Sequence, residues 1–268
     1  MAKKEDAPTN KPSRGIYLLP NLFTTAAIFA GFYAIVASMD GRFESAAIAI
    51  FVAMIMDGLD GRVARLTNTQ SDFGVQYDSL SDMVSFGLAP SLVLFQWGLS
   101  DLGKLGWFAA FVYTATAALR LARFNTRVGV VDKRYFQGLA SPAAAAVLAG
   151  FVWVAEEYGL RGSGMNLVAL VLTVGAGLLM VSNILYRSFK DLDLKGKVPF
   201  VVAVVVVLVF AVVLIQPPLV LFAIAFSYAF SGPVTALFFR KRNRTESSEE
   251  STDGGQKNTE NGSDSEAK

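Results

Sequence analysis

Long apolar stretches follow one another along the chain, and short polar segments separate them. About 20 helical residues span the hydrocarbon core of a bilayer, and apolar runs of this length recur eight times. The pattern therefore predicts an all-α, polytopic integral membrane protein with eight transmembrane helices. We predict these helices at residues 16–38, 44–65, 76–98, 105–123, 137–155, 166–185, 199–216 and 218–239.

Lys and Arg are distributed unequally over the two sides of the predicted membrane protein. Nineteen of those before residue 245 fall at the N-terminus, in the even-numbered connections or after the last helix, whereas Arg42, Lys104 and Arg161 face the other side. The positive-inside rule then places both termini in the cytoplasm. Such a basic surface would also attract anionic lipid headgroups or a phosphorylated substrate.

Composition limits the chemistry that the chain can perform. Hydrophobic residues make up 53% of it, and it contains no cysteine and no histidine. Disulfides and thiolate metal sites are therefore excluded. Acid–base chemistry would depend on carboxylates, Lys, Tyr or bound water, and a bound metal would be a hard ion that prefers oxygen ligands.

Four aspartates interrupt the apolar pattern of the second and third predicted helices. Asp57 lies about 20 Å into the second helix, and Asp82 about 9 Å into the third, which runs in the opposite direction. Both residues therefore fall at a similar depth, near the cytoplasmic surface. Asp60 and Asp78 share the same helix faces, together with small residues that allow the two helices to approach closely.

Four carboxylates at one depth would repel one another, and divalent cations would offset that repulsion. Carboxylates without His or Cys suit Mg²⁺ or Mn²⁺, and two such ions form a template for phosphoryl chemistry. The alternative is that the aspartates cap helix ends or pair with Arg62 and Arg65. Acidic residues within membrane segments favour the functional interpretation.

The spacing of these aspartates resembles the signature of the CDP-alcohol phosphatidyltransferases. The sequence reads Asp57-x2-Asp60-Gly61-x2-Ala64-Arg65-x8-Gly74-x3-Asp78-x3-Asp82. The resemblance extends over the first six predicted helices. It implies a six-helix catalytic membrane core at 16–189, preceded by a cytoplasmic segment at 1–15 and followed by two additional helices at 190–244. Residues 245–268 are polar and acidic, which predicts a disordered cytoplasmic tail.

Residues between and after the aspartates resemble the phosphatidylserine synthase branch of that family. The stretches that carry this resemblance are "DSLSDM", "ALRLARFN", "FQGLASPAAAA" and "SFK". It implies transfer of a phosphatidyl group from CDP-diacylglycerol to the hydroxyl of L-serine, with release of CMP. A sister enzyme with glycerol-3-phosphate or inositol phosphate as acceptor is the nearest alternative. A divalent-cation transporter is a more remote one, because the helix segments beyond the aspartates are apolar.

The resemblance also implies roles for individual residues. Asp57, Asp60, Asp78 and Asp82 would bind two divalent ions, Mg²⁺ or Mn²⁺, and Asp82 would also act as the general base. The residues expected to bind CDP-diacylglycerol are Asn21, Thr24, Asp57, Gly61, Arg65 and Ser71. Helix initiation and capping for Asn21 and Thr24, helix packing for Gly61 and interfacial snorkelling for Arg65 are the simpler readings.

Serine needs a cationic partner for its carboxylate. The cationic candidates on the appropriate side are Arg120, Arg123 and Lys133, although positive-inside topology alone also explains such cations. Gln137 and Ser141 would add polar contacts to serine. Membrane lipids and a possible homodimer complete the expected partners, and we expect no nucleic acid. A cytoplasmic active site in this branch suggests a bacterial inner membrane.

Overall fold

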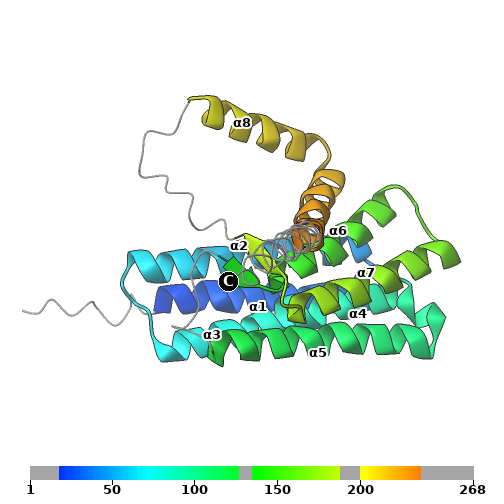
Figure 1. The fold of residues 1–268 in the computed structure, drawn as a ribbon, viewed down its shortest axis with the longest axis horizontal. Coiled ribbons are helices and arrows are strands. Elements are labelled where there is room, and N and C mark those ends of the chain that lie inside the picture. Colours follow the sequence, from blue (N-terminus) through cyan, green and yellow to red (C-terminus); the bar gives the residue numbers. More distant parts are fainter. Residues whose placement is uncertain (1–17, 127–134, 188–199, 237–268) are drawn as a thin grey trace, which may run out of the picture.

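The computed structural model describes residues 18–126, 135–187 and 200–236. The predicted N-terminal segment, most of the connection to the seventh helix, the acidic tail and Lys133 lie outside these residues. Within them the protein is almost entirely helical (Figure 1). The elements in chain order are α1 (Leu18–Met39), α2 (Phe43–Leu66), α3 (Asp72–Asp82), η1 (Met83–Leu88), α4 (Ala89–Trp97), η2 (Leu99–Leu102), α5 (Lys104–Thr126), β1 (Tyr135–Gln137), α6 (Ser141–Glu157), α7 (Ser163–Val181), β2 (Leu185–Arg187), α8 (Phe200–Ile215) and a last helix, Pro217–Ala236.

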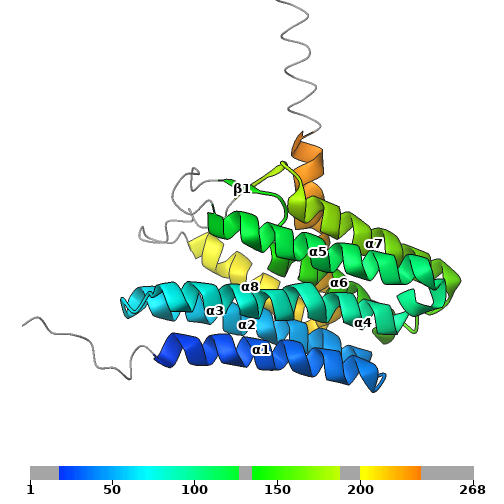
Figure 2. The same cartoon turned by 90° about the horizontal axis from the view of Figure 1, so that it is seen from below.

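Helices α1 to α7 lie side by side and form one bundle (Figures 1 and 2). Helix α1 packs along α2, α2 along α6, and α5 along α7. Alanines line the seam between the first two helices, where Ala34, Ala46 and Ala53 are fully buried. Because their side chains are small, the two backbones can approach closely. This close approach brings the end of α2 that carries aspartates against α1.

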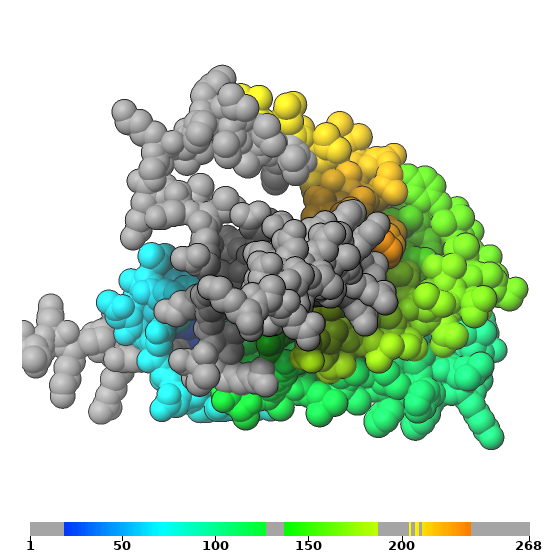
Figure 3. Space-filling model, viewed as in Figure 1, coloured from blue at the N-terminus to red at the C-terminus, as the bar shows by residue number. Residues whose placement is uncertain are grey.

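Helix α8 lies apart from this bundle. It shares no extended contact with another labelled helix of the described chain, and its yellow atoms lie at the edge of the molecule in Figure 3. The last helix, Pro217–Ala236, returns to the bundle and packs on α6, where the rings of Phe151 and Phe222 lie 6.3 Å apart.

The observed helices confirm an all-α, polytopic membrane protein. Four of the described helices are long and apolar enough to cross a membrane: Leu19–Met39, Lys104–Thr126, Ser163–Val181 and Pro217–Ala236. The eight-span count exceeds these four and stays a prediction. Helix α2 carries several charged residues, and α6 and α8 have only 17 and 16 residues.

The predicted helix boundaries were wrong around residues 137–140 and 182–185. Tyr135–Gln137 and Leu185–Arg187 form a short antiparallel strand pair instead. Gly138 adopts φ +78°, where a side chain would collide with the carbonyl oxygen of Met180. Because a right-handed helix requires negative φ, α6 begins only at Ser141. Gln137 therefore lies on β1, and not at the start of a helix as predicted.

The third predicted helix contains a π-helical segment, η1, directly after Asp82. The N–H of Ala89 donates to the carbonyl of Val84, five residues earlier. Tyr113 on α5 donates its hydroxyl to the Phe86 carbonyl at 3.0 Å, within this segment. Single turns of π-helix are frequent at functional sites, and this one changes the helix rotation between Asp82 and α4.

An aromatic and ionic cluster fastens the end of the bundle opposite to the aspartates. The guanidinium of Arg161 lies 4.9 Å from the Phe43 ring centroid and 5.1 Å from that of Trp97. It also donates to Glu156 at 2.5 Å and to the Trp97 carbonyl at 2.9 Å. Helices α2, α4 and α6 thus share one cation.

We predict that Arg161→Ala lowers the thermal unfolding midpoint in detergent by several degrees. Two cation–π contacts and one partly exposed ion pair together contribute about 2 kcal/mol. That loss corresponds to about 4–8 °C for a domain of this size. Arg42→Ala is the matched control, because Arg42 pairs with an exposed Asp40 and stacks on one ring only. Equal shifts of the unfolding midpoint in both variants would show that the contacts of Arg161 do not stabilise the bundle more than those of Arg42.

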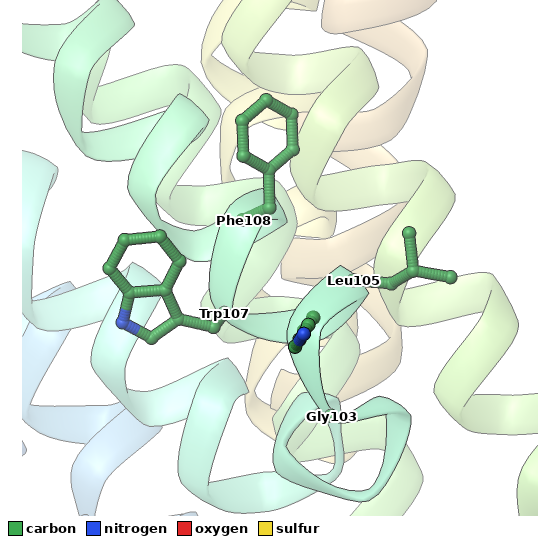
Figure 4. A pocket seen from close by; sticks show the side chains of 5 residues that line it. Gly103, Leu105, Trp107 and Phe108 are labelled. Carbon is green, nitrogen blue, oxygen red and sulfur yellow. The ribbon is translucent and has the colours of Figure 1, made fainter.

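A shallow apolar hollow lies at the start of α5, lined by Gly103, Lys104, Leu105, Trp107 and Phe108 (Figure 4). Trp107 and Phe108 expose 61% and 58% of their surface. The hollow lies at the first turn of α5, whereas Arg120 and Arg123 lie near the other end of α5, about 22 Å or more away along the helix. Exposed Trp beside Lys is typical of a membrane interface.

Candidate active site

The aspartates from α2 and α3 converge at one end of the bundle. One carboxylate oxygen from each of Asp57, Asp60 and Asp78 lies within 4.8 Å of the other two. Asp82 follows one turn after Asp78, and its carboxyl contacts that of Asp57. The antiparallel course of α2 and α3 brings residues 18 or more positions apart into a single cluster.

The chemistry of this cluster suits a metal ion. Every potential ligand is a carboxylate oxygen, as hard divalent cations prefer. Buried polar atoms normally have hydrogen-bond partners, yet the buried Oδ1 atoms of Asp78 and Asp82 have none among the described residues. These oxygens remain available to a ligand. The aspartate cluster could therefore hold a metal ion.

Helix α1 fixes the position of the cluster. The hydroxyl of Thr24 donates to Oδ2 of Asp60 at 2.7 Å, and both side chains are buried. Two serines of the third helix donate to backbone carbonyls of α1, Ser81 to Thr24 and Ser85 to Ala27. At Gly31 a Cβ would lie 2.8 Å from Ser85, so only glycine permits this approach. Helix α1 thereby holds both Asp60 on α2 and the helix turns around Asp82.

The expected nucleotide-binding residues border the cluster. Ser71 caps α3 by accepting a hydrogen bond from the Gly74 N–H at 3.0 Å. A Cβ on Gly74 would lie 3.8 Å from Oδ1 of Asn21, so Asn21 and Ser71 meet at the start of α3. Thr24 donates to Asp60 and lies nearly two turns beyond the start of α1. Its side chain is therefore not the helix cap that the simpler interpretation expected.

Gly61 and Arg65 flank the cluster on α2. Apart from its chain neighbours and the adjacent backbone of α2, no described atom lies within 4 Å of the position that a Cβ of Gly61 would occupy. Close helix packing therefore does not explain this glycine, and open space remains beside it. Arg65 is exposed at the end of α2, within electrostatic range of Asp60. Both residues border the same side of the carboxylates.

Helix α5 carries two of the expected arginines, and Arg120 is the one that reaches the cluster. Arg120 lies within electrostatic range of Asp82 and donates to the hydroxyl of Ser141, the first residue of α6. Its Nε atom is buried without a hydrogen-bond partner among the described residues. Arg123 donates to Gln137 and, at 2.9 Å, to Asn183. Four of the five expected serine-binding residues thus lie together, and the fifth, Lys133, is outside the described residues.

Sequence patterns did not reveal several residues that shape this region. Asn183 and Tyr186 follow α7, and Tyr186 donates its hydroxyl to the Ala229 carbonyl at 2.9 Å. Burial raises the pKa of Tyr186 to about 12, so this hydroxyl remains protonated at neutral pH. Asn125 donates to Ser79 at 3.0 Å and joins α5 to α3. Asn125 and Tyr186 could have been suspected only as polar residues near otherwise apolar segments.

Carboxylates that converge from α2 and α3 are typical of a metal-dependent enzyme, and comparison with known families identifies its class. Residues 17–181 match the family CDP-alcohol phosphatidyltransferase, and the chain belongs to that family. It is 38% identical over 199 residues to the CDP-diacylglycerol–serine O-phosphatidyltransferase of Helicobacter pylori strain 26695, covering 74% of this chain and 84% of that protein.

Other relatives carry similar names. The enzyme of the same name from Mycobacterium tuberculosis strain H37Rv is 29% identical over 228 residues, which cover 82% of this chain and 79% of the relative. The archaetidylserine synthase of Methanothermobacter thermautotrophicus is 32% identical over 170 residues, covering 63% and 69%. The names of these three relatives all include serine.

Proposed function

We propose that this protein transfers the phosphatidyl group of CDP-diacylglycerol to the hydroxyl of L-serine and releases CMP. The observation that carries the proposal is the cluster of Asp57, Asp60, Asp78 and Asp82, with Arg120 within electrostatic range of Asp82. Carboxylates suit the charge of a pyrophosphate only through bound cations. A buried arginine suits the carboxylate of an amino-acid acceptor.

The four aspartates would hold two divalent ions, Mg²⁺ or Mn²⁺. Two observations support these metal sites. Carboxylate oxygens of Asp57, Asp60 and Asp78 lie within 4.8 Å of one another, and a buried oxygen of Asp78 and one of Asp82 have no hydrogen-bond partner among the described residues. When bound, such ions supply positive charge beside the transferred phosphate and the departing CMP. Thr24 keeps the Asp60 carboxylate oriented toward the other aspartates through its 2.7 Å hydrogen bond.

Asp82 would accept the proton of the serine hydroxyl. The serine oxygen then forms a bond to the phosphorus of the phosphatidyl group, while the bond from that phosphorus to the CMP oxygen breaks. A carboxylate is the base that we favour, because the chain contains no histidine and four carboxylates meet at this site. For the same reason few side chains could form a covalent phosphatidyl intermediate, so we favour a single in-line displacement.

The nucleotide would lie on the side of the cluster bordered by Asn21, Ser71 and Gly61. Open space beside Gly61 allows a phosphate or ribose to approach the backbone. Arg65 could pair with a phosphate oxygen at that edge. The acceptor would lie on the opposite side, where Arg120, Arg123, Gln137 and Ser141 meet.

This proposal also concerns the organisation of the chain in the membrane. The family match ends at residue 181, which supports 16–189 as the catalytic core and 190–244 as an addition to it. The active site and both termini would face the cytoplasm at a bacterial inner membrane, and the tail at 245–268 would be dispensable for catalysis. A homodimer is testable from the mass of the protein in detergent.

We predict that Thr24→Val raises the Mn²⁺ concentration needed for half-maximal activity by about tenfold or more. A hydrogen-bond partner of a metal ligand typically contributes 10–100-fold in metal affinity. Activity measured over a range of Mn²⁺ concentrations provides the test. Thr25→Val is the control, because Thr25 is exposed and contacts Tyr77, not an aspartate. An unchanged Mn²⁺ dependence would show that Thr24 does not support the metal site.

The experiment that tests the function uses purified protein in detergent with CDP-diacylglycerol and Mn²⁺ or Mg²⁺. Labelled L-serine, glycerol-3-phosphate and inositol phosphate are supplied in separate reactions, and CMP and labelled lipid are measured. We expect product with serine only, and none after addition of EDTA. Product with another alcohol would retain the family chemistry but overturn the serine acceptor. No CMP release with any acceptor would contradict the transferase and favour cation transport.

A further inference from the structure

The last helix, Pro217–Ala236, lies beyond the family match and yet reaches the active-site end of the bundle. Tyr186 on β2 donates to the Ala229 carbonyl at 2.9 Å. Gly232 accommodates the ring of Tyr186 so closely that a Cβ there would lie 2.3 Å from it. The last helix is therefore fixed against the strand pair that also carries Gln137.

This attachment places Tyr228 near Arg120. The Tyr228 ring lies 5.6 Å from that of Tyr186, and Tyr228 lies within electrostatic range of Arg120. Arg120 in turn lies within range of Asp82 and donates to Ser141. The arginine is thus between an aspartate of the catalytic cluster and a tyrosine from the additional helix.

Arg120 has capacity for a further partner. Its buried Nε has no hydrogen-bond partner among the described residues, and a guanidinium edge can hold a carboxylate through two parallel hydrogen bonds. A carboxylate in that position would lie near Asp82 on one side and near Tyr228 on the other. Aromatic rings beside such a pair exclude water and strengthen it.

We propose that Tyr228 forms a wall of the acceptor pocket and positions the Arg120 guanidinium, so that the last helix contributes to recognition of a hydroxyl-bearing amino acid. This inference rests on the proposed function. It assigns to the last helix a role in acceptor specificity, because a residue from outside the matched region lies within electrostatic range of Arg120. Tyr228 is a positioning residue here, not a group that exchanges protons.

The chain contains no cysteine, so a single introduced thiol can be labelled without background. The two variants to compare are Tyr228→Cys and Ser227→Cys. Ser227 is exposed, and its side chain points about 100° away from that of Tyr228 around the helix axis. Each variant is labelled with N-ethylmaleimide in the presence of Mn²⁺ and CMP, with and without saturating L-serine. We expect serine to slow labelling at position 228 at least fivefold and to leave position 227 unchanged within twofold.

Kinetics supply a second measurement on variants that keep a larger side chain. We expect Tyr228→Leu to raise the KM for serine about tenfold and to leave the KM for CDP-diacylglycerol within twofold, with Tyr228→Phe between it and the natural protein. A purely structural role would change both KM values and lower the unfolding midpoint. The inference would be overturned if serine left the labelling rate at position 228 unchanged, or if both KM values changed equally.

Failure of the proposed function has a different signature. If the natural protein transfers phosphatidyl groups only to another alcohol, serine is not the acceptor, and the same labelling with that alcohol decides whether Tyr228 lines its pocket. If that alcohol protects position 228 from labelling, Tyr228 lines the acceptor pocket. If it gives no protection, Tyr228 does not line the pocket. If no alcohol supports CMP release, the function and the inference are both overturned.

Discussion

Asp82→Asn should reduce kcat for phosphatidyl transfer to serine by about 10³-fold or more. A positioned general base contributes about 10²–10⁴-fold, and the same change removes a charged metal ligand from the cluster. Labelled lipid and CMP release measured at saturating substrates and Mn²⁺ provide the test. Asp72→Asn is the matched control, because Asp72 is exposed at the first turn of the same helix and lies outside the cluster.

The asparagine variant should remain folded, because Ser81 and Ser85 still join this helix to α1. An unfolding midpoint near that of the natural protein would establish that the loss is chemical. Activity above one tenth of the natural level would contradict a role for Asp82 as base or ligand. A loss that high Mn²⁺ reverses would assign Asp82 to metal binding and remove the proton transfer from its role.

Helix positions and the aspartate cluster were predictable because each follows from a local periodic pattern. An apolar run of membrane length defines a helix, and a spacing of three or four residues keeps Asp57 with Asp60 and Asp78 with Asp82 on single faces. The short connection of residues 67–71 then makes the two helices antiparallel neighbours. The exact approach of the carboxylates also depends on α1, which packs against both helices.

Contacts between distant segments were not predictable in the same way. Apolar periodicity continues through Gln137 and Ser182, and only the left-handed backbone at Gly138 and the strand pairing show where the helices end. The bond from Thr24 to Asp60 depends on the rotation of α1 against α2. The approach of Tyr228 to Arg120 depends on how the last helix returns, over residues more than 100 positions apart, and no local pattern encodes that.

Arg120→Met should raise the KM for serine by about 10–100-fold and also lower kcat. Hydrogen bonds to a charged group contribute about 1.5–3 kcal/mol, which corresponds to this range. The loss of kcat follows because Arg120 lies within electrostatic range of Asp82, and its removal also leaves the hydroxyl of Ser141 without this hydrogen bond. Arg120→Lys should recover part of the activity, since it keeps the charge but not the paired geometry.

The informative comparison is between the two substrates. Arg62→Met is the matched control, because Arg62 is exposed on α2. Steady-state kinetics with each substrate varied in turn should show a change in the KM for serine at least fivefold larger than that for CDP-diacylglycerol. A KM change confined to CDP-diacylglycerol would place Arg120 on the nucleotide side of the cluster. The carboxylate of the acceptor would then need another cation. Arg123 is the described candidate, because it lies one turn after Arg120 on α5 and donates to Gln137 and Asn183.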